Sequence, residues 1–396
     1  MIPHLRKAYN EQFTQEKFDR MVTDIESVYD QSVVFRVSET PVFVPADLTR
    51  KLVSACESIV DVIVQPNFKD LTEKSIPDNQ RLPNEPDFSH FIVMDFGIMQ
   101  DKEGVLQPRL IEMQGFPSLF CWQDMLATHY KKHFDIPANL NNFFNGFDHD
   151  KYIGLLSKIV LDDCKPEEVV LLEVKPKEQK TRIDFYATQG MLGIEILDLN
   201  DLKADGKTLW YLKDGKRQDI KRIYNRIIFD DLFAQDDLGD AVDLTKSYDV
   251  QWIPHPNWFY RISKYTLPFI DNEYVPKTRF LSEFRPDNAD LDKYVLKPLF
   301  SFAGQGVVID VRPEDLDAVK DPENWIVQEK VDYGPVIETP NVPAKCEIRM
   351  IYFWEPGASR PTLVHNLCRM SKGKMVGVRY NDEFDWVGGT VCFFEH

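Results

Sequence analysis

The last third of the chain, from about residue 259, is a succession of short β-rich runs, and this feature constrains the fold most. The runs are KYVLKPLF, GVVIDV, WIVQEKV, CEIRMIYFW, TLVHNLCRMS, MVGVRYN and GGTVCFF, each rich in β-branched or aromatic residues. A single short helix, PEDLDAVKD, is expected among them. The fold must therefore contain substantial β-structure at this end.

The middle of the chain instead alternates between strand and helix. VVLLEV (169–174) is a continuous apolar run of the kind buried in parallel sheets, a helix is expected over 181–192, and IEILDL (194–199) is the next strand. This βαβ order predicts a doubly wound, Rossmann-like unit, although no GxGxxG fingerprint follows the first strand. TLWYL and IKRIYNRII flank DGK and are predicted to form another strand pair.

The first part of the chain is predicted to be mostly helical, with one hairpin. Apolar periodicity indicates helices over 10–29 and after Pro45, with Asp47 as the cap of the second helix. The polar stretch 65–87 is typical of a surface loop. HFIVMDFGIM and QPRLIEMQG, joined by QDKEG, predict a β-hairpin, and residues 121–160 are expected to be helical.

Composition bounds the class of protein. A chain of 396 residues needs two or three domains, and 43% hydrophobic residues are ample for their cores. The 47 basic and 64 acidic residues give a net charge of −17, which argues against nucleic acid or an anionic membrane as a partner. Local basic clusters can still serve a small anionic ligand.

Cysteine spacing and apolar runs narrow the class further. The six cysteines are far apart, with no CxxC pair, so buried free thiols are expected in place of zinc or disulfides. No basic start is followed by an apolar run, and no 18-residue apolar stretch exists, so neither a signal peptide nor a membrane helix is expected. These patterns favour a cytoplasmic enzyme or binder.

A glycine loop next to a lysine is the first motif with chemical content. In YVLKPLFSFAGQGVVI a strand ends near Lys297 and is followed by Gly304, Gln305 and Gly306. Small residues let backbone N–H groups approach phosphate oxygens, and a nearby lysine neutralises their charge. An ordinary hairpin with a solvated lysine is the competing interpretation, and is favoured for the motif alone.

Two further strands carry oxygen-bearing side chains. IVQEKV carries Glu329 and exposed backbone that can bond an adenine edge, although an ordinary strand end is the favoured account of this motif alone. Glu112 and Gln114 lie two residues apart and so share one face of a strand, with Asp95 on the other arm of the hairpin. Such oxygens can ligate Mg²⁺; a solvated polar face is the alternative.

The C-terminal strands add arginines. Glu347 and Arg349 share one face of CEIRM, Arg369 lies in LCRMSKG, and Asn381 precedes Gly388 and Gly389. Fixed guanidinium groups can stabilise the charge of a transferring phosphoryl group. A structural Glu–Arg cross-strand pair is the competing account.

Taken together and in order, these motifs resemble the ATP-grasp family. The matching elements, in sequence order, are Lys297, Gly304-Gln305-Gly306, Gln328-Glu329-Lys330-Val331, Glu347-Ile348-Arg349, Arg369 and Asn381 with Gly388-Gly389. The family's closing metal hairpin does not follow them. Asp95-Phe96, Gly104 and Ile111-Glu112-Met113-Gln114 look like that hairpin, near the other end of the chain, with Gln114 where the family usually has Asn.

The chain therefore resembles a circularly permuted ATP-grasp protein, similar to the synthetase part of glutathionylspermidine synthetases. The likeness covers roughly 88–120 and 260–396 well and the middle more loosely, and no amidase segment is recognisable. It implies an α/β (α+β) fold in three parts. These are 1–150, with N-terminal helices and the hairpin 88–116; 151–260, a Rossmann-like substrate-side domain; and 261–396, the ATP-grasp lid and core.

The resemblance also implies a reaction and roles. ATP would phosphorylate a substrate carboxylate, and an amine would attack the acyl-phosphate to give an amide, ADP and phosphate. By this resemblance, ATP would be bound by Lys264, Lys297, residues 301–306, Gln328, Glu329, Lys330, Val331 and Asn381. Mg²⁺ would be held by Asp95, Glu112 and Gln114. The transferring phosphoryl group would be stabilised by Arg349 and Arg369.

Arg182 and Arg226 are candidates for holding the substrate carboxylate. The expected partners are a small peptide-like or amino-acid-like acid and an amine. Two alternatives stay open: a kinase that stops at phosphoryl transfer, and a nucleotide-binding protein without ligase activity.

Overall fold

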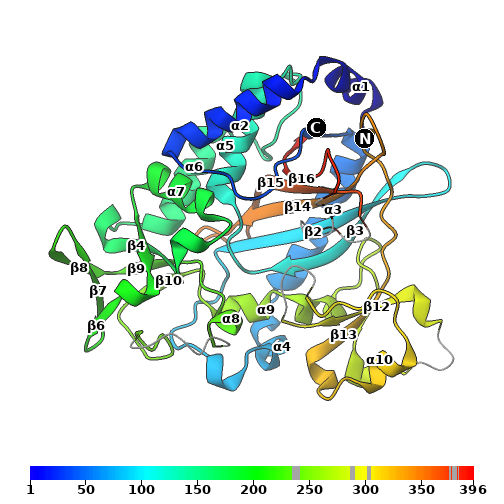
Figure 1. Ribbon diagram of the computed structural model, residues 1–396. Helices are drawn as coiled ribbons and strands as arrows, with labels where there is room; N and C mark the ends of the chain where they lie inside the picture. The colour runs from blue at the N-terminus through cyan, green and yellow to red at the C-terminus, as the bar shows by residue number, and fades with distance from the viewer. Residues whose placement is uncertain (234–240, 286–289, 301–304, 374–375, 377–380, 382) are drawn as a thin grey trace.

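The computed structural model describes residues 1–396 except 234–240, 286–289, 301–304, 374–375, 377–380 and 382. Its described strands form five sheets, and three of these position the candidate site (Figure 1). The result is a mixed α/β fold, as predicted.

The central sheet has five antiparallel strands in the order β16-β15-β14-β2-β3. β2 (Phe91–Gln100) and β3 (Leu106–Gln114) form the predicted hairpin, and β2 also pairs with β14 (Lys345–Phe353). β15 (Thr362–Ser371) and β16 (Gly388–Thr390) complete the sheet. Segments from near the two ends of the sequence thus share one sheet, and one face of it carries the candidate site.

The parallel sheet has the order β10-β9-β4-β5. β4 (Val169–Glu173) is followed by helix α7 (Arg182–Leu192) and β5 (Glu195–Asp198), which confirms the predicted βαβ unit. β9 (Arg222–Asn225) and β10 (Gln251–Ile253) lie on the other side of β4.

Of the two strands predicted to pair around DGK, the first is correct and the second is wrong. β7 (Thr208–Lys213) pairs with β8 (Lys216–Ile220), and β6 (Lys203–Asp205) pairs with β7. The turn between β7 and β8 has φ 50° at Asp214 and 73° at Gly215. Asp-Gly with positive φ makes a tight two-residue hairpin, so the polar KRQDI segment pairs there and the apolar IKRIYN segment joins the parallel sheet.

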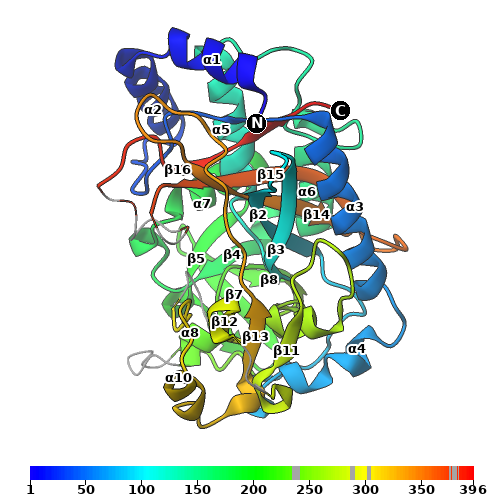
Figure 2. The same ribbon diagram turned by 90° about the vertical axis from the view of Figure 1, so that its right-hand side faces the viewer.

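The small sheet has the order β11-β13-β12 and lies opposite β3. Its strands are β11 (Thr278–Phe280), β12 (Tyr294–Pro298) and β13 (Trp325–Glu329), with helix α10 (Pro313–Asp317) beside them (Figure 2). GVVIDV was expected to be a strand but contributes only a single bridge between Val308 and Leu296. Most of MVGVRYN lies outside the described residues.

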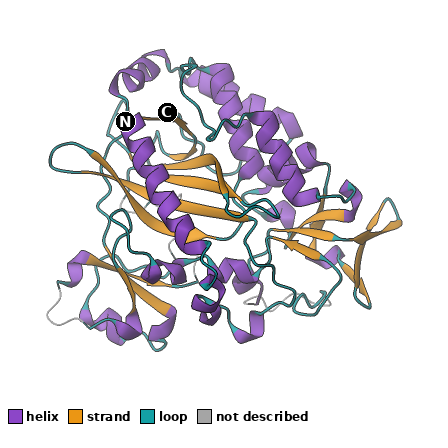
Figure 3. Ribbon diagram, turned by 180° about the vertical axis from the view of Figure 1, so that it is seen from behind, coloured by secondary structure: helices purple, strands orange, loops and turns teal. Residues whose placement is uncertain are grey.

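Helices cover the central sheet. α3 (Ala46–Ile63) runs along one face with its predicted apolar positions buried (Figure 3). Asp47 is not its cap: Pro45 occupies that position, and Asp47 lies in the first turn 3.0 Å from Lys51. The other described helices are α1 (Pro3–Gln12), α2 (Gln15–Tyr29), α4 (Phe68–Leu71), α5 (Phe120–His133), α6 (His149–Leu161), α8 (Phe229–Phe233) and α9 (Asn257–Arg261).

These bounds refine the predicted helices. The helix expected over 10–29 is interrupted at residues 13–14, where Thr14 caps α2, and the helical stretch 121–160 is two helices with an irregular connection. The predicted loop 65–87 contains α4. Among the described residues, no helix combines the length and apolar character needed to cross a bilayer.

Both ends of the chain meet at one short strand. β1 (Val42–Val44) pairs in parallel with β17 (Cys392–Phe394). The backbone N–H of Ile2 donates to Phe43 O at 3.1 Å, and that of Glu395 donates to Val44 O at 2.9 Å. The N- and C-termini therefore lie near each other (Figures 1 and 2). The domain boundaries at 150 and 260 stay a prediction.

Candidate functional site

Two cavities adjoin on one face of the central sheet. The first, of about 350 Å³, lies between the small sheet and the central sheet and is called the lysine pocket after Lys264, Lys297, Lys330 and Lys345 in its walls. The second, of about 340 Å³, is called the arginine pocket. Arg369 of β15 lines both, so it marks the boundary between them.

Lys297 is one of two buried lysines in the wall of the lysine pocket. It lies on β12, is 7% exposed, and its Nζ donates to Gln328 Oε1 at 2.6 Å and to Ile111 O at 3.1 Å. Burial lowers the pKa of Lys297 to about 8, with Glu112 opposing the shift. Burial also lowers the pKa of Lys264, whose Nζ is 4.0 Å from Glu112 Oε2. The pocket thus holds two poorly solvated ammonium groups, a suitable setting for an anion.

The end of β13, predicted from the sequence to read adenine, forms another wall of the lysine pocket. Gln328, Glu329, Lys330 and Val331 all line the pocket. The Gln328 amide is committed to Lys297 and to Thr278 Oγ1, and Lys330 pairs with Asp310 at 3.2 Å. Among these four, Val331 supplies an apolar surface, to which Val295, Val307 and Ile309 add.

The glycine loop is only partly visible in this arrangement. Gly304 lies outside the described residues. Gly306 has φ 73°, the left-handed backbone that favours glycine. Neither Gln305 nor Gly306 contributes to the described wall of the lysine pocket, whereas the next residue, Val307, does.

Asp95 is the centre of a buried ion cluster on the central sheet. Arg349 lies directly opposite it on β14 and donates from Nε and Nη2, both at 2.6 Å. Arg369 donates to Asp95 at 2.7 Å and also to Glu347. Burial by itself raises the pKa of Asp95, but the two guanidinium groups outweigh it and lower the pKa. Both predicted catalytic arginines therefore converge on one carboxylate.

Glu347 behaves differently in the same cluster. It accepts a hydrogen bond from Tyr333 Oη at 2.8 Å and another from Arg369. Burial raises its pKa, and the neighbouring Asp95 charge adds to the rise. The predicted cross-strand face of Glu347 and Arg349 thus exists, but Glu347 pairs with Arg369.

The predicted magnesium ligands fit the ion only in part. Asp95 is 1% exposed and both of its oxygens accept guanidinium N–H groups, so it does not fit as a ligand in this arrangement. Glu112 and Gln114 lie together, with Gln114 Nε2 3.2 Å from Glu112 Oε1, and their oxygens suit Mg²⁺. No group of three His, Cys, Asp or Glu side chains in the described chain is arranged to hold a metal.

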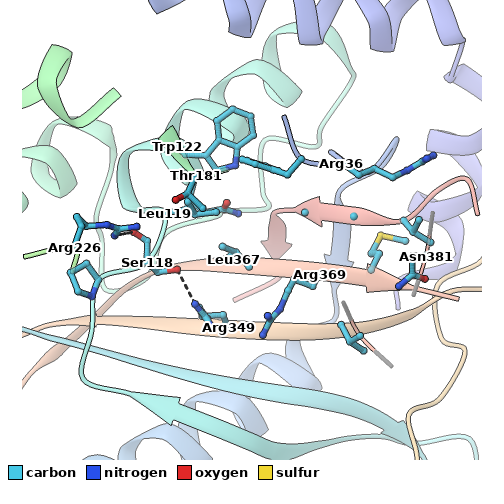
Figure 4. A pocket seen from close by; sticks show the side chains of 18 residues that line it. Arg36, Ser118, Leu119, Trp122, Thr181, Arg226, Arg349, Leu367, Arg369 and Asn381 are labelled. Atoms are coloured by element: carbon cyan, nitrogen blue, oxygen red, sulfur yellow. Dashed lines mark hydrogen bonds between the residues drawn. The ribbon is translucent and has the colours of Figure 1, made fainter. Parts of the chain in front are cut away.

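The arginine pocket is bounded by cations and aromatic rings. Figure 4 shows Arg36 and Arg226 at opposite ends, with Arg349 and Arg369 between them. Trp122 of α5 lies over the middle and is edge-to-face with Phe35, at 5.2 Å between ring centroids. An acid with an apolar body suits this combination of walls.

The structure separates three sequence predictions here. Arg226, predicted for the substrate, lines the arginine pocket; Arg182 is not among its described lining residues, whereas the adjacent Thr181 is. Asn381, predicted for ATP, lies in the wall of the arginine pocket and not in that of the lysine pocket. Its Oδ1 accepts bonds from Ser371 Oγ, Lys372 N and Gly373 N at 2.9 to 3.1 Å, so it shapes a turn.

Some lining residues were missed, above all Arg36, Ser118, Trp122 and Tyr333. The Gly388-Gly389 pair in the sequence is a signal of the close contact that Arg36 makes. A Cβ on Gly388 would lie 2.5 Å from Arg36 O, and Gly389 N donates to that oxygen at 2.9 Å. The Gly-Gly pair therefore marks a close backbone approach, although the sequence does not say which segment approaches.

The fold and site together define a mixed α/β protein whose cationic cavities lie between sheets. No family model matches the chain, and no curated protein does. A solved structure that it resembles is a glutathione synthetase-like effector from Globodera pallida, in its apo form. The TM-score is 0.57 at 11% sequence identity, over 97% of this chain and 98% of that one. At this identity the likeness shows the fold alone.

Proposed function

We propose that the chain is an ADP-forming, ATP-dependent carboxylate–amine ligase with a circularly permuted ATP-grasp fold. The observation that carries the proposal is the meeting of two cationic pockets at Arg369. A nucleotide in one pocket and a carboxylate in the other would meet at that guanidinium. The likeness of fold to a glutathione synthetase-like protein supports the proposal.

The lysine pocket has the properties expected of a nucleotide site. Lys264 and Lys297 are desolvated cations, so phosphate oxygens would recover the interactions that burial removed. The apolar wall of Val295, Ile309 and Val331 suits the faces of an adenine. Mg²⁺ would be held by Glu112 and Gln114, and when bound it neutralises phosphate charge.

The proposed reaction has two steps. An oxygen of the substrate carboxylate attacks the γ-phosphorus of ATP, and the bond to the β-phosphate oxygen breaks to release ADP. An amine nitrogen then attacks the carbonyl carbon, phosphate leaves, and the nitrogen loses a proton. Arg369 and Arg349 would hold the transferring phosphoryl group, while Asp95 keeps both guanidinium groups in place.

The primary test is calorimetric titration of the wild-type protein with ATP, with and without Mg²⁺. Lys297→Ala should weaken binding at least tenfold, and Lys293→Ala, a matched change at an exposed lysine, should leave it unchanged. Screening acids with amines for ADP release then tests the ligase. A well-folded wild-type protein that does not bind ATP would overturn the proposal.

One observation favours a second candidate, an ATP-binding protein without ligase activity. Both oxygens of Asp95 are occupied by arginines, which removes one of the three predicted metal ligands. ATP binding with no ADP release for any acid and amine pair would support this candidate. A phosphorylated acid that persists as the final product even when amines are present would instead indicate a kinase.

A further inference from the structure

Arg226 lies where an open parallel sheet most often meets its ligand. It directly follows β9, and its backbone N–H donates to Leu172 O of β4 at 3.0 Å. The chain runs from β4 to β5 on one side and later returns to β9 on the other side of β4. The carboxyl ends of β4 and β9 therefore form the topological switch point, outside which such sheets bind ligands.

The Arg226 guanidinium is buried but incompletely satisfied. The residue is 7% exposed and lies over the rings of Phe116 and Phe185, at 5.9 and 5.2 Å. Its Nη1 donates to Ser118 O at 2.7 Å, whereas its Nε is buried without a partner among the described residues. Asp184 approaches Nη1 only to 3.9 Å. An unmet donor on a desolvated cation is costly, and a bound anion would remove that cost.

Two other buried arginines show how this chain satisfies a structural guanidinium. Arg222, four residues earlier, donates to Val160 O, Ile159 O and Asp162. Arg261 donates to Glu73 and twice to Glu85. Neither has a buried unpartnered nitrogen, whereas Arg6, Arg36 and Arg369 share the deficit seen at Arg226, the last two in the same pocket.

The arginine pocket contains little negative charge to compensate Arg226. Its described lining residues include four arginines and no Asp or Glu, in a chain of net charge −17. Arg36 is paired elsewhere, with Glu39 at 2.8 Å and Asp385 at 3.3 Å. The carboxylate that Arg226 approaches is Asp184, at 3.9 Å and outside the described lining, so the buried Nε of Arg226 remains available to an anion.

Arg226 is separate from the reacting position but close to it. Arg226 donates to the backbone oxygen of Ser118, and Arg349 donates to Ser118 Oγ at 3.0 Å. Because one serine bridges them, the two donating nitrogens are at most roughly 10 Å apart. The carboxyl carbons of an extended four- to six-carbon diacid are about 4 to 6 Å apart, which suits that span. Leu119, Trp122 and Leu367 offer apolar surface for the methylene groups.

We propose that the arginine pocket binds a short dicarboxylic acid, with one carboxylate at the Arg349 and Arg369 pair and the second at Arg226. The inference rests on the proposed function, because that function makes the carboxylate at Arg369 the reacting group. Arg226 then selects the substrate and takes no part in bond formation. Acids with a single carboxylate leave the buried Nε of Arg226 without a partner and bind less well.

The test measures binding of simple diacids without ATP. The full-length protein is titrated by calorimetry at constant ionic strength with succinate, glutarate and adipate, and with the monoacids of matching length. We expect at least one diacid to bind ten times more tightly than its monoacid. Arg226→Gln should reduce that preference to less than threefold, Arg226→Lys should retain part of it, and Arg217→Gln, at an exposed arginine, should leave it intact.

ATP titrations of the same samples separate this inference from the proposed function. Absence of a diacid preference in the wild type, or an unchanged preference in a folded Arg226→Gln, overturns the inference even if ATP binds normally. A diacid preference that depends on Arg226 supports the inference even if ATP fails to bind, in which case only the proposed ligase is overturned. Circular dichroism establishes that each variant is folded.

Discussion

At the scale of single residues, the central feature is one carboxylate that serves two arginines. Asp95 is almost fully buried and holds Arg349 and Arg369 at 2.6 and 2.7 Å. Removing one partner of a buried ion pair leaves uncompensated charge. The stability of the cluster therefore depends on a single side chain.

We predict that Asp95→Asn lowers the free energy of unfolding by roughly 3 to 5 kcal/mol, because both guanidinium groups lose their counter-charge. Urea denaturation provides the measurement. Asp87→Asn is the matched control, since its side chain is 96% exposed in a surface pair with Lys69, and it should change little. An Asp95→Asn protein as stable as the wild type would show that the cluster is not stabilising.

The contacts of Asp95 with Arg349 and Arg369 also predict how the stability of the protein changes in acid. The folded pKa of Asp95 is lowered, so its stabilising contribution is complete above its ordinary pKa of 3.8 and is lost as the pH falls through the folded value. We expect the stability difference between wild type and Asp95→Asn to shrink below about pH 4. Urea titrations from pH 6 downward measure it, and a constant difference would contradict the lowered pKa.

The lowered pKa of Lys297 predicts that the affinity for ATP falls at alkaline pH. Its pKa of about 8 means that the ammonium is largely neutral at pH 9.5, whereas bound phosphate would return the pKa toward 10.5. The affinity for ATP should therefore fall roughly 20-fold between pH 7 and pH 9.5 from this group alone. In the Lys297→Arg variant the side chain stays charged over this range, and the titration of ATP itself is the same as for the wild type. Its curve of ATP affinity against pH should therefore be flatter, and identical curves would contradict the prediction.

At the scale of elements, two segments of the chain pack closely at Gly115, just after β3. An added Cβ would lie 2.5 Å from Trp258 O and 3.0 Å from Ile262 Cβ. Gly115→Ala should cost roughly 1 to 3 kcal/mol of stability because backbone must move. Gly154→Ala, at an exposed position of α6 with nothing within 4 Å, should instead stabilise by roughly 0.5 to 1 kcal/mol. Denaturant curves that give the two changes the same sign would contradict this account.

Elements with strong local patterns could be predicted from the sequence, whereas pairings between distant segments could not. The β2–β3 hairpin, α3 and the β4–α7–β5 unit follow from apolar period and turn residues. The partner of β9 and the contact of Arg36 with Gly389 depend on where separate parts of the chain meet. The same limit applies to the site, because Lys297 was found by motif but Ser118 only by tertiary structure.

At the scale of the whole molecule, the hairpin and the C-terminal strands are contiguous in space but not in sequence. Ile2 and Glu395 bond to adjacent residues of β1, so a short linker can join the ends. We predict that a permutant with joined ends and a new opening in the exposed segment between Ala138 and Asn139 folds and keeps its ATP affinity within about threefold of the wild type. Loss of folding would show that the order of segments is needed for assembly.

The shared wall at Arg369 has a consequence for the order in which ligands arrive. Two anions that both rely on this one guanidinium must divide a single positive charge, so each weakens the other's ground-state affinity, and by thermodynamic reciprocity the factor is the same in both directions. That antagonism eases when the phosphoryl group passes to the acid, because the γ-phosphate and the carboxylate then form one acyl-phosphate group while ADP stays in the other pocket. Each substrate would thus bind more weakly when the other pocket is already occupied, and phosphoryl transfer would remove part of that repulsion.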